Sequence, residues 1–449
     1  MSVDFLLQVF AEHADRAAVV WRDRPVTYGE LLTFYDGWRQ RLAAERMPAG
    51  AVVSVEADFS PTAIALLLAL WEREAIIVPL TSSVEAKKPE FRAVAQVEFE
   101  AHIDETDQCR IVSTGVIPDH PLVLQLKERR HPGLVLFSSG STGKSKGAIH
   151  DILPLLDKFK TRRQSLSTLA FLLFDHIGGI NTLLYTLSNA GCVVVANDRA
   201  PERVCQTIQA HRVELLPTSP TFLNLLLVSE AYRRYDLSSL QLVTYGTEVM
   251  PDSTLRRFRD ALPNVKLSQT YGLSELGIMR AKSRSSDSLW VKIGGEGFAT
   301  RVVDGLLEIK AESAMLGYLN APSPFTEDGW FMTGDAVEVD GEYFRILGRR
   351  SEIINVGGEK VYPTEVESVL QQMAGLEDVV VRGEPSALTG QMVTAVVKLQ
   401  TDESIADFRK RMRTFCEGKL DRFKVPQKVV LTSDDVHGER FKKKRLATV

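Results

Sequence analysis

Short apolar, β-branched runs alternate with longer amphipathic segments through the first three quarters of this 449-residue chain. Runs typical of buried strands are Val52–Val55, Ile76–Leu80, Leu134–Phe137 and Cys192–Ala196. Segments with a helical spacing of apolar residues are Pro61–Glu72, Gly179–Leu187, Ala200–His211 and Thr221–Glu230. Strands that alternate with helices are typical of parallel sheets covered by helices. The pattern therefore predicts an α/β fold with layered, largely parallel sheets.

The pattern changes near Gly329. Two or three short strands surround an Asp340–Gly341 turn, and a strand, a glycine turn and a helix beginning at Pro363 follow. Two more strands, a helix from Ile405 and a lysine-rich tail complete the chain. A chain of this length exceeds one ordinary compact core. We predict a large N-terminal domain of layered α/β sheets, residues 1–348, and a small, mobile α+β C-terminal domain, residues 349–449.

Composition narrows the class of protein. The apolar fraction is 44%, the charged fraction is 25% and the formal net charge is -4, so nothing attracts the whole chain to nucleic acid. The first residues lack the features of a signal peptide, and the longest apolar stretch of the first domain, near Thr62–Trp71, is too short to span a membrane. The four cysteines are scattered and form neither a disulfide nor a zinc pattern. We expect a cytoplasmic protein with no nucleic-acid partner and no membrane insertion.

A loop rich in Ser, Thr, Gly and Lys follows the apolar run at 134–137. Such a loop can surround phosphate oxygens with backbone N–H groups, hydroxyls and ammonium charge. A flexible linker is the alternative, but linkers rarely follow a buried strand. The residues that we predict to bind phosphate are Ser138, Ser139, Gly140, Ser141, Thr142, Gly143, Lys144 and Lys146.

The same loop partly matches the Walker pattern GxxxxGK[ST]. Gly143, Lys144 and Ser145 match its end, but Ser138 stands where the first glycine is required. A Walker loop opens directly into a helix, whereas the sequence after Gly147 is typical of extended backbone. The context therefore disfavours a P-loop nucleotidase.

Five segments, in order along the chain, resemble motifs of the adenylate-forming superfamily of acyl-CoA synthetases, aryl-CoA ligases and adenylation domains. The matching segments are SSGSTGKSKG at 138–147, FDHIGG at 174–179, LSQTYGLSE at 267–275, MLGYLNAPSPFTEDGWFMTGD at 315–335 and GRRSEIINVGGEKVYPTEVE at 348–367. The resemblance implies a large domain, a small domain that rotates between two half-reactions, and the cofactors ATP, Mg²⁺ and CoA.

The resemblance also implies roles for individual residues. Tyr271 is expected to stack on adenine, and Asp335 and Arg349 to bind the ribose. Glu275 is expected to bind Mg²⁺, an ion that prefers carboxylate and phosphate oxygens. His176 is expected beside the acyl pocket. Further residues implied to bind the nucleotide or line the site are Gly246, Thr247, Glu248, Thr270, Gly272, Ser274 and Gly358, and Thr142 is implied to be catalytic together with His176 and Glu275.

The chain departs from the family pattern at two places. Ser351 stands at the hinge position that usually holds Asp or Lys. The family's catalytic lysine directly follows a glycine, whereas Gly438 is followed here by Glu439. We assign the catalytic role to Lys442, which requires a lengthened loop, with Lys443 and Lys444 as alternatives. A solvated basic tail is the competing interpretation.

The resemblance implies a two-step reaction. A small-molecule carboxylic acid, aryl or fatty acyl, attacks the α-phosphorus of ATP, and a thiol then takes the acyl group from the acyl-adenylate. The segment GGEKVYPTEVE favours CoA as the thiol. Two alternatives stay open: a stand-alone enzyme that loads the phosphopantetheine of a carrier protein, and a catalytically impaired nucleotide- or acyl-binding protein.

Overall fold

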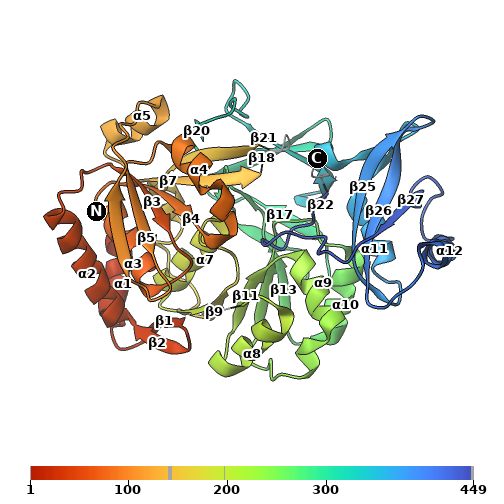
Figure 1. The fold of residues 1–449 in the computed structure, drawn as a ribbon, viewed down its shortest axis with the longest axis horizontal. Helices are drawn as coiled ribbons and strands as arrows, with labels where there is room; N and C mark the ends of the chain where they lie inside the picture. The colour runs from red at the N-terminus through yellow and green to blue at the C-terminus, as the bar shows by residue number, and fades with distance from the viewer. Residues whose placement is uncertain (1, 140–143, 197, 446–449) are drawn as a thin grey trace.

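The computed structural model describes residues 2–139, 144–196 and 198–445 (Figure 1). Helices and sheets of the N-terminal part form the bulk of the molecule, and the strands from β25 onward lie to one side with α12 at the outer edge. The four cysteines are free, as the sequence predicts. Within the described ranges, none of the helices combines the length and apolarity that a membrane span requires.

Two mostly parallel sheets of seven strands build the large domain. In sheet order the first comprises β13 (Lys266–Gln269), β12 (Leu242–Tyr245), β11 (Leu215–Thr218), β9 (Ser167–Ala170), β10 (Cys192–Val195), β1 (Ala17–Trp21) and β2 (Arg24–Thr27). The second comprises β20 (Gly317–Tyr318), β8 (Ser145–Asp151), β7 (Gly133–Ser139), β4 (Ile76–Leu80), β3 (Val52–Glu56), β5 (Phe99–Ile103) and β6 (Cys109–Ser113).

Smaller sheets follow along the chain. A six-stranded antiparallel sheet comprises β16 (Ala281–Ser283), β17 (Trp290–Ile293), β22 (Tyr343–Arg349), β21 (Phe331–Asp340), β19 (Leu306–Ala311) and β18 (Phe298–Val303). A short ribbon pairs β14 (Gly272–Leu273) with β15 (Gly277–Ile278). The last sheet comprises β24 (Glu359–Val361), β23 (Ile354–Val356), β26 (Gly390–Leu399), β25 (Leu376–Ser386) and β27 (Lys428–Leu431).

Helices cover these sheets and begin where the sequence provides caps. Ser60 caps α3 and accepts a hydrogen bond from Ala63 N, with Pro61 at the first helical position. The helices are α1 (Asp4–Glu12), α2 (Tyr28–Ala44), α3 (Pro61–Glu72), α4 (Lys88–Ala95), α5 (Pro121–Arg129), α6 (Ile152–Asp157), α7 (Ile177–Ser188), α8 (Pro201–His211), α9 (Pro220–Ser229), α10 (Asp252–Ala261), α11 (Pro363–Leu370) and α12 (Ile405–Cys416).

The hydrophobic residues separate into distinct cores. The core around α11, α12, β25 and β26 draws its buried members from Ile354–Val429, while the other core clusters lie N-terminal to it. Gly348 has φ 145°, a conformation that glycine adopts readily, at the end of β22. The α/β fold is confirmed. We propose that the domain boundary lies between residues 348 and 349.

Candidate active site

The segment predicted to hold phosphates joins two strands of a β-hairpin. β7 and β8 pair antiparallel from Gly133 opposite Asp151 to Ser139 opposite Ser145. The extended β8 excludes a Walker loop, which would open into a helix. Ser138 is half-buried, and Lys144 is exposed to solvent. Four of the predicted residues lie outside the described part of the chain: Gly140, Ser141, Thr142 and Gly143.

Side chains from the segment after β19 hold β8 in place. Asn320 Oδ1 accepts a hydrogen bond from Gly147 N at 3.0 Å, and its Nδ2 donates to the Ser145 carbonyl at 2.9 Å. Lys146 Nζ lies 5.0 Å from the centre of the Tyr318 ring. A cation over an aromatic face is attracted to it. The lysine that follows the loop therefore has a fixed neighbour in β20.

Glu275 lies in the turn between β14 and β15, and this turn is held from two sides. His150 on β8 contacts the Ser274 carbonyl through Nε2 at 2.6 Å. Burial lowers the pKa of His150, so the neutral ring donates this hydrogen bond. The Tyr318 hydroxyl donates to Glu275 Oε1 at 2.7 Å. Tyr318 thus contacts both Lys146 and Glu275, and it places the predicted phosphate and metal residues side by side.

The predicted ribose residues face each other on neighbouring strands. Asp335 on β21 is opposite Arg349 on β22, and Arg349 Nε lies 3.2 Å from Asp335 Oδ1. The Tyr271 hydroxyl donates to the other carboxylate oxygen of Asp335. Burial raises the pKa of Asp335, although Arg349 and Tyr271 oppose this shift. Tyr271 packs in a hydrophobic cluster, and its stacking on adenine stays a prediction.

The loop after β12 is tightly packed. A Cβ atom on Gly246 would lie 2.6 Å from Thr270 Oγ1, so only glycine fits there. Thr247 has φ 73°, which is strained for a β-branched residue. Glu248 Oε1 accepts a hydrogen bond from the backbone N of Lys443 at 2.6 Å. The loop thus contacts the C-terminal tail as well as Thr270, the residue that follows β13.

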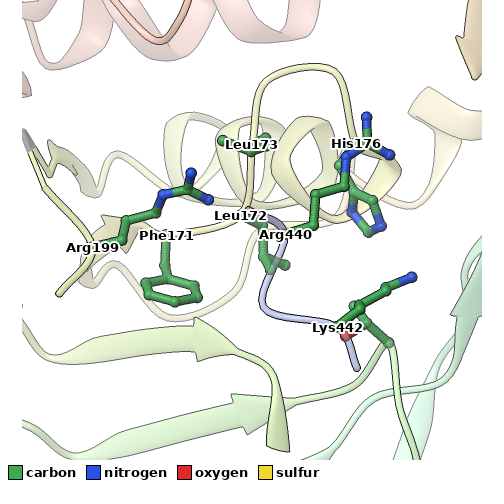
Figure 2. Close-up of a pocket in the computed structure, with 8 residues that line it drawn as sticks. Phe171, Leu172, Leu173, His176, Arg199, Arg440 and Lys442 are labelled. Atoms are coloured by element: carbon green, nitrogen blue, oxygen red, sulfur yellow. The ribbon is translucent and has the colours of Figure 1, made fainter. Parts of the chain in front are cut away.

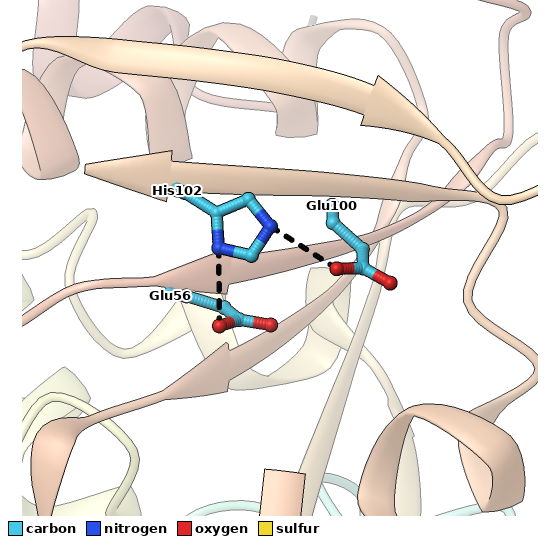
Figure 3. A group of neighbouring side chains, drawn as sticks. All are labelled: Glu56, Glu100 and His102. Atoms are coloured by element: carbon cyan, nitrogen blue, oxygen red, sulfur yellow. Dashed lines mark hydrogen bonds and ion pairs between the residues drawn. The ribbon is translucent and has the colours of Figure 1, made fainter. Parts of the chain in front are cut away.

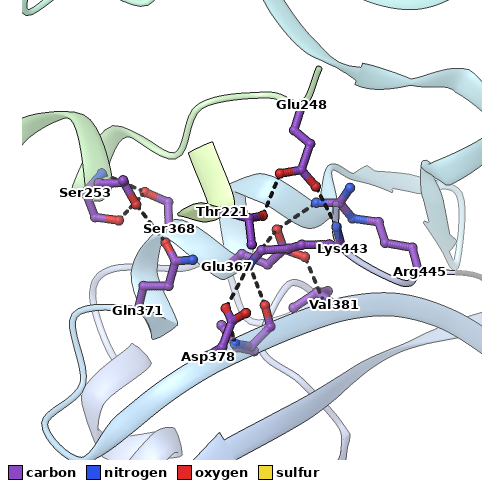
Figure 4. A network of polar contacts seen from close by, with 12 residues as sticks. Thr221, Glu248, Ser253, Glu367, Ser368, Gln371, Asp378, Val381, Lys443 and Arg445 are labelled. Atoms are coloured by element: carbon purple, nitrogen blue, oxygen red, sulfur yellow. Dashed lines mark hydrogen bonds and ion pairs between the residues drawn. The ribbon is translucent and has the colours of Figure 1, made fainter. Parts of the chain in front are cut away.

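Two basic residues of the tail are buried against the small domain (Figure 4). Lys443 Nζ donates to the Val379 carbonyl at 2.5 Å and lies 3.5 Å from Asp378 Oδ1 and 3.6 Å from Glu367 Oε2. Arg445 Nη2 lies 2.8 Å from the same carboxylate oxygen of Glu367. Burial alone would raise the pKa of Glu367, but Arg445 and Lys443 hold it below its usual value. In this structure Lys443 is therefore held by the small domain, which favours Lys442 as the catalytic lysine.

Lys442 lines a small cavity together with His176. It stays accessible to solvent, yet the surrounding protein removes enough water to lower the pKa of its amine, and Arg349 adds to this shift. Glu248 and Glu275 act in the opposite direction. These interactions show that Lys442 lies near both the ribose pair and the predicted metal ligand. The tail is therefore folded against the site and is not a solvated basic tail.

The loop before Lys442 forms a tight turn. The backbone N of Gly438 donates to the Lys442 carbonyl at 2.9 Å, and the backbone N of Phe441 donates to the Gly438 carbonyl at 2.9 Å. Phe441 has φ 49°. The match of the family glycine to Gly438, with a lengthened loop before Lys442, stays a prediction. A phenylalanine takes the left-handed conformation that glycine adopts more easily.

His176 forms the N-cap of α7 and lines a small cavity (Figure 2). Its Nδ1 accepts a hydrogen bond from Gly178 N at 3.0 Å, and burial keeps its pKa well below the ordinary value. The neutral ring is thus fixed beside the space where an acid was expected. The residues that line the cavity are Phe171, Leu172, Leu173, His176, Arg199, Thr247, Arg440 and Lys442.

Other predicted residues lie farther from these contacts. Gly272 pairs with Ile278 in the β14–β15 ribbon. Gly358, with φ 97°, lies in the turn between β23 and β24, and nothing lies within 4 Å of the position that its Cβ would take. Ser351 is exposed in a short 3₁₀ turn after β22. The structure therefore leaves the predicted roles of Gly358 and Ser351 as predictions.

A second group of metal-type side chains lies at the ends of β3 and β5 (Figure 3). His102 Nδ1 lies 3.2 Å from Glu56 Oε2, and its Nε2 lies 3.1 Å from Glu100 Oε2. Arg92 contacts both carboxylates, and Lys88 Nζ lies 3.5 Å from Glu56 Oε2. Because cations of the protein already balance these acids, we interpret the group as an ion-pair network.

Residues that sequence motifs did not single out complete the site. His150, Tyr318 and Asn320 hold the loop and the Glu275 turn, and Phe441 precedes Lys442. Tyr318 and Asn320 lie within the segment 315–335, and its resemblance to a family motif was the sequence feature that could have identified them. His150 carried none, because a histidine in a buried strand has many structural uses.

Comparisons with known proteins agree with this geometry. A family model described as AMP-binding enzyme matches residues 6–305, and a model described as AMP-binding enzyme C-terminal domain matches residues 365–442. The chain is 25% identical over 453 residues to 2-succinylbenzoate–CoA ligase of Enterococcus faecalis, covering 92% of this chain and 91% of that protein. It is 28% identical over 333 residues to indoleacetate–CoA ligase of Aromatoleum aromaticum, covering 68% of this chain but only 64% of that protein.

Among solved structures, a crystal structure of an anthranilate CoA ligase in complex with anthranoyl-AMP superimposes with a TM-score of 0.81. The match covers 96% of this chain and 93% of that one at 20% identity, so it shows the fold alone. The two family models together span most of the chain. The chain therefore belongs to the AMP-binding enzyme family, the adenylate-forming superfamily, and is an acid–thiol ligase of the AMP-forming type.

Proposed function

We propose that the protein activates a carboxylic acid with ATP and transfers the acyl group to CoA. One observation carries the proposal: Lys442 from the tail is close enough to Glu275 of the β14–β15 turn and to Arg349, the partner of Asp335, for their charges to shift its pKa. The cavity beside His176 opens from the same place, because Lys442 lines both. Groups suited to a nucleotide thus lie next to a small cavity at the predicted acid site.

Each group has a defined task in the first step. Asp335 accepts hydrogen bonds from the ribose hydroxyls, and Arg349 fixes the orientation of its carboxylate. Lys146 and Lys442 place positive charge at the phosphates, where negative charge grows during attack by the acid. Burial and Arg349 lower the pKa of Lys442, and the N–H groups of its amine can donate hydrogen bonds to phosphate oxygens. Neutral His176 faces the acid without adding charge.

Glu275 fits the role of Mg²⁺ ligand. The Tyr318 hydroxyl donates to one carboxylate oxygen of Glu275 and fixes the group, while the other oxygen has no partner among the described residues. A magnesium ion held by one carboxylate and by phosphate oxygens is the usual arrangement for this ion. When bound, Mg²⁺ would offset charge on the phosphates as pyrophosphate leaves.

The thiol acceptor is the finer part of the proposal. Relatives named as CoA ligases support CoA, and 2-succinylbenzoate–CoA ligase is matched along nearly its whole length. Loading of a carrier protein is the second candidate, favoured only by the general resemblance to adenylation domains. We keep the cytoplasm as the compartment, in agreement with the four free cysteines.

A two-part assay tests the proposal. Exchange of labelled pyrophosphate into ATP, measured over a panel of short-chain, long-chain and aromatic acids, reports the first step. Release of AMP with and without CoA then reports the second step. Exchange with at least one acid and CoA-dependent AMP release are expected. Exchange without any response to CoA would favour a carrier protein, and no exchange with any acid would contradict the activity.

A further inference from the structure

The tip of the C-terminal tail fills space beside the predicted acid pocket. A tight turn carries this tip: Phe441 N donates to Gly438 O, and the isolated bridge between His437 and Lys443 closes its base. Ser219 Oγ, at the start of α9, donates to the Phe441 carbonyl at 2.9 Å. The turn is therefore fixed to the large domain directly before Lys442.

The ring of Phe441 packs into an aromatic cluster of the large domain. Its centroid lies 5.3 Å from that of Phe171 and 5.6 Å from that of Phe222, and the rings of Phe171 and Phe222 are 4.4 Å apart. The guanidinium carbon of Arg199 lies 5.7 Å from the ring centroid of Phe441. Phe171 and Arg199 also line the cavity beside His176. Phe441 therefore packs against the outer side of two residues that form the cavity wall.

The neighbours of Phe441 in the chain close the same cavity. Arg440 and Lys442 both line it, and Arg440 Nη2 lies 2.9 Å from Asp175 Oδ2, next to His176 (Figure 2). With the tail in place the cavity measures about 10 Å³, which is room for about one water molecule. The tail that delivers Lys442 thus also decides how much space an acid has.

We propose that Phe441 is a specificity-determining residue that restricts the adenylation step to small carboxylic acids, because its ring packs against Phe171 and Arg199 of the pocket wall. This inference rests on the proposed function. The sequence offers a suitable substitution: glycine adopts the φ of 49° freely, so Phe441→Gly keeps the turn that places Lys442 while it removes the ring. Phe441→Leu is the matched control, because it keeps most of the bulk.

The first experiment compares acids in the pyrophosphate exchange assay. The kcat/KM for benzoate relative to that for propionate is expected to rise at least tenfold in Phe441→Gly and to change less than threefold in Phe441→Leu. A single methylene in an apolar pocket already changes selectivity by about tenfold or more, and a phenyl ring is larger. An unchanged ratio, or a loss of exchange with every acid, would overturn the inference, since the ring would then only anchor the tail.

A binding measurement separates this inference from the proposed function. Benzoyl- and propionyl-sulfamoyl adenosine are non-reactive mimics of the acyl-adenylates, and calorimetry gives their affinities without turnover. The benzoyl mimic is expected to gain at least tenfold in affinity relative to the propionyl mimic in Phe441→Gly. Equal relative affinities in the wild type and Phe441→Gly would contradict the pocket role. If the wild type showed no pyrophosphate exchange but Phe441→Gly still gained relative affinity for the benzoyl mimic, the proposed ligase activity would be contradicted and the pocket role of Phe441 would stand.

Discussion

Lys442 and Lys443 are neighbours in the chain, but the structure predicts opposite consequences for their replacement by methionine. Lys443 is buried among Glu367, Asp378 and the Val379 carbonyl, and its loss leaves Asp378 without a counter-charge and Glu367 with Arg445 alone. Removing one partner of a buried ion pair costs about 3–5 kcal/mol. Lys442 has no ion pair among the described residues and is accessible to solvent, so its replacement should change stability by about 0.5 kcal/mol or less.

The two effects can be measured separately. All five tryptophans precede Gly348, so their fluorescence follows the large domain. Hydrogen exchange at Val379 and Val381 of β25 follows the small domain, where Lys443→Met should accelerate exchange by about 10²–10⁴-fold. Lys442→Met should leave hydrogen exchange at these amides unchanged. It should lower acid-dependent pyrophosphate exchange by about 10²–10³-fold, as the loss of a hydrogen-bond donor to the transition state does.

The outcome can refute the assignment in either direction. The comparison is made at a temperature where Lys443→Met is folded. If this variant lost as much pyrophosphate exchange activity as Lys442→Met, Lys443 would be the catalytic lysine. If Lys442→Met instead destabilised the small domain, the position of Lys442 near Arg349 and Glu275 would be wrong.

Three further changes test other parts of the site. Asp335→Asn removes the charge opposite Arg349, so the KM for ATP in the exchange assay should rise at least tenfold, and an unchanged KM would place the ribose elsewhere. His150→Phe removes the hydrogen bond to the Ser274 carbonyl, so the Mg²⁺ concentration for half-maximal exchange should rise about tenfold; an unchanged requirement would contradict the positioning role. Burial lowers the pKa of Lys158 from 10.5 to about 7. Between pH 7 and 10.5 the unfolded chain therefore binds more protons than the folded chain. The free energy of unfolding should rise with pH in this range, by at most about 1.4 kcal/mol per pH unit. Lys158→Met should flatten this dependence in urea unfolding at pH 7–9, and an equal slope would refute the shift.

Regular elements were the part of the fold that the sequence predicted best. Strand β4 and helix α3 have the predicted bounds, because strong β-branched or apolar patterns coincide with proline and serine caps. The extended β8 was also predicted, from the residues after Gly147. The order of strands in the sheets was not predictable, because it depends on contacts between residues far apart in the chain.

The candidate site shows the same division. Motifs identified Glu275, Asp335 and Arg349, and the structure places the latter two opposite each other. The sequence alone left the choice between Lys442 and Lys443 open, because two adjacent lysines differ only in the contacts that the folded chain gives them. The left-handed backbone conformation of Phe441 was not predictable, since it is a property of the folded turn.

A crystal structure with ATP and Mg²⁺ tests the central claim most directly. We expect the phosphates to lie between Lys146 and Lys442. Glu275 should bind the ion, and Asp335 should accept hydrogen bonds from the ribose hydroxyls. A nucleotide bound elsewhere, with Glu275 still turned only toward Tyr318 and no phosphate near Lys146, would contradict it.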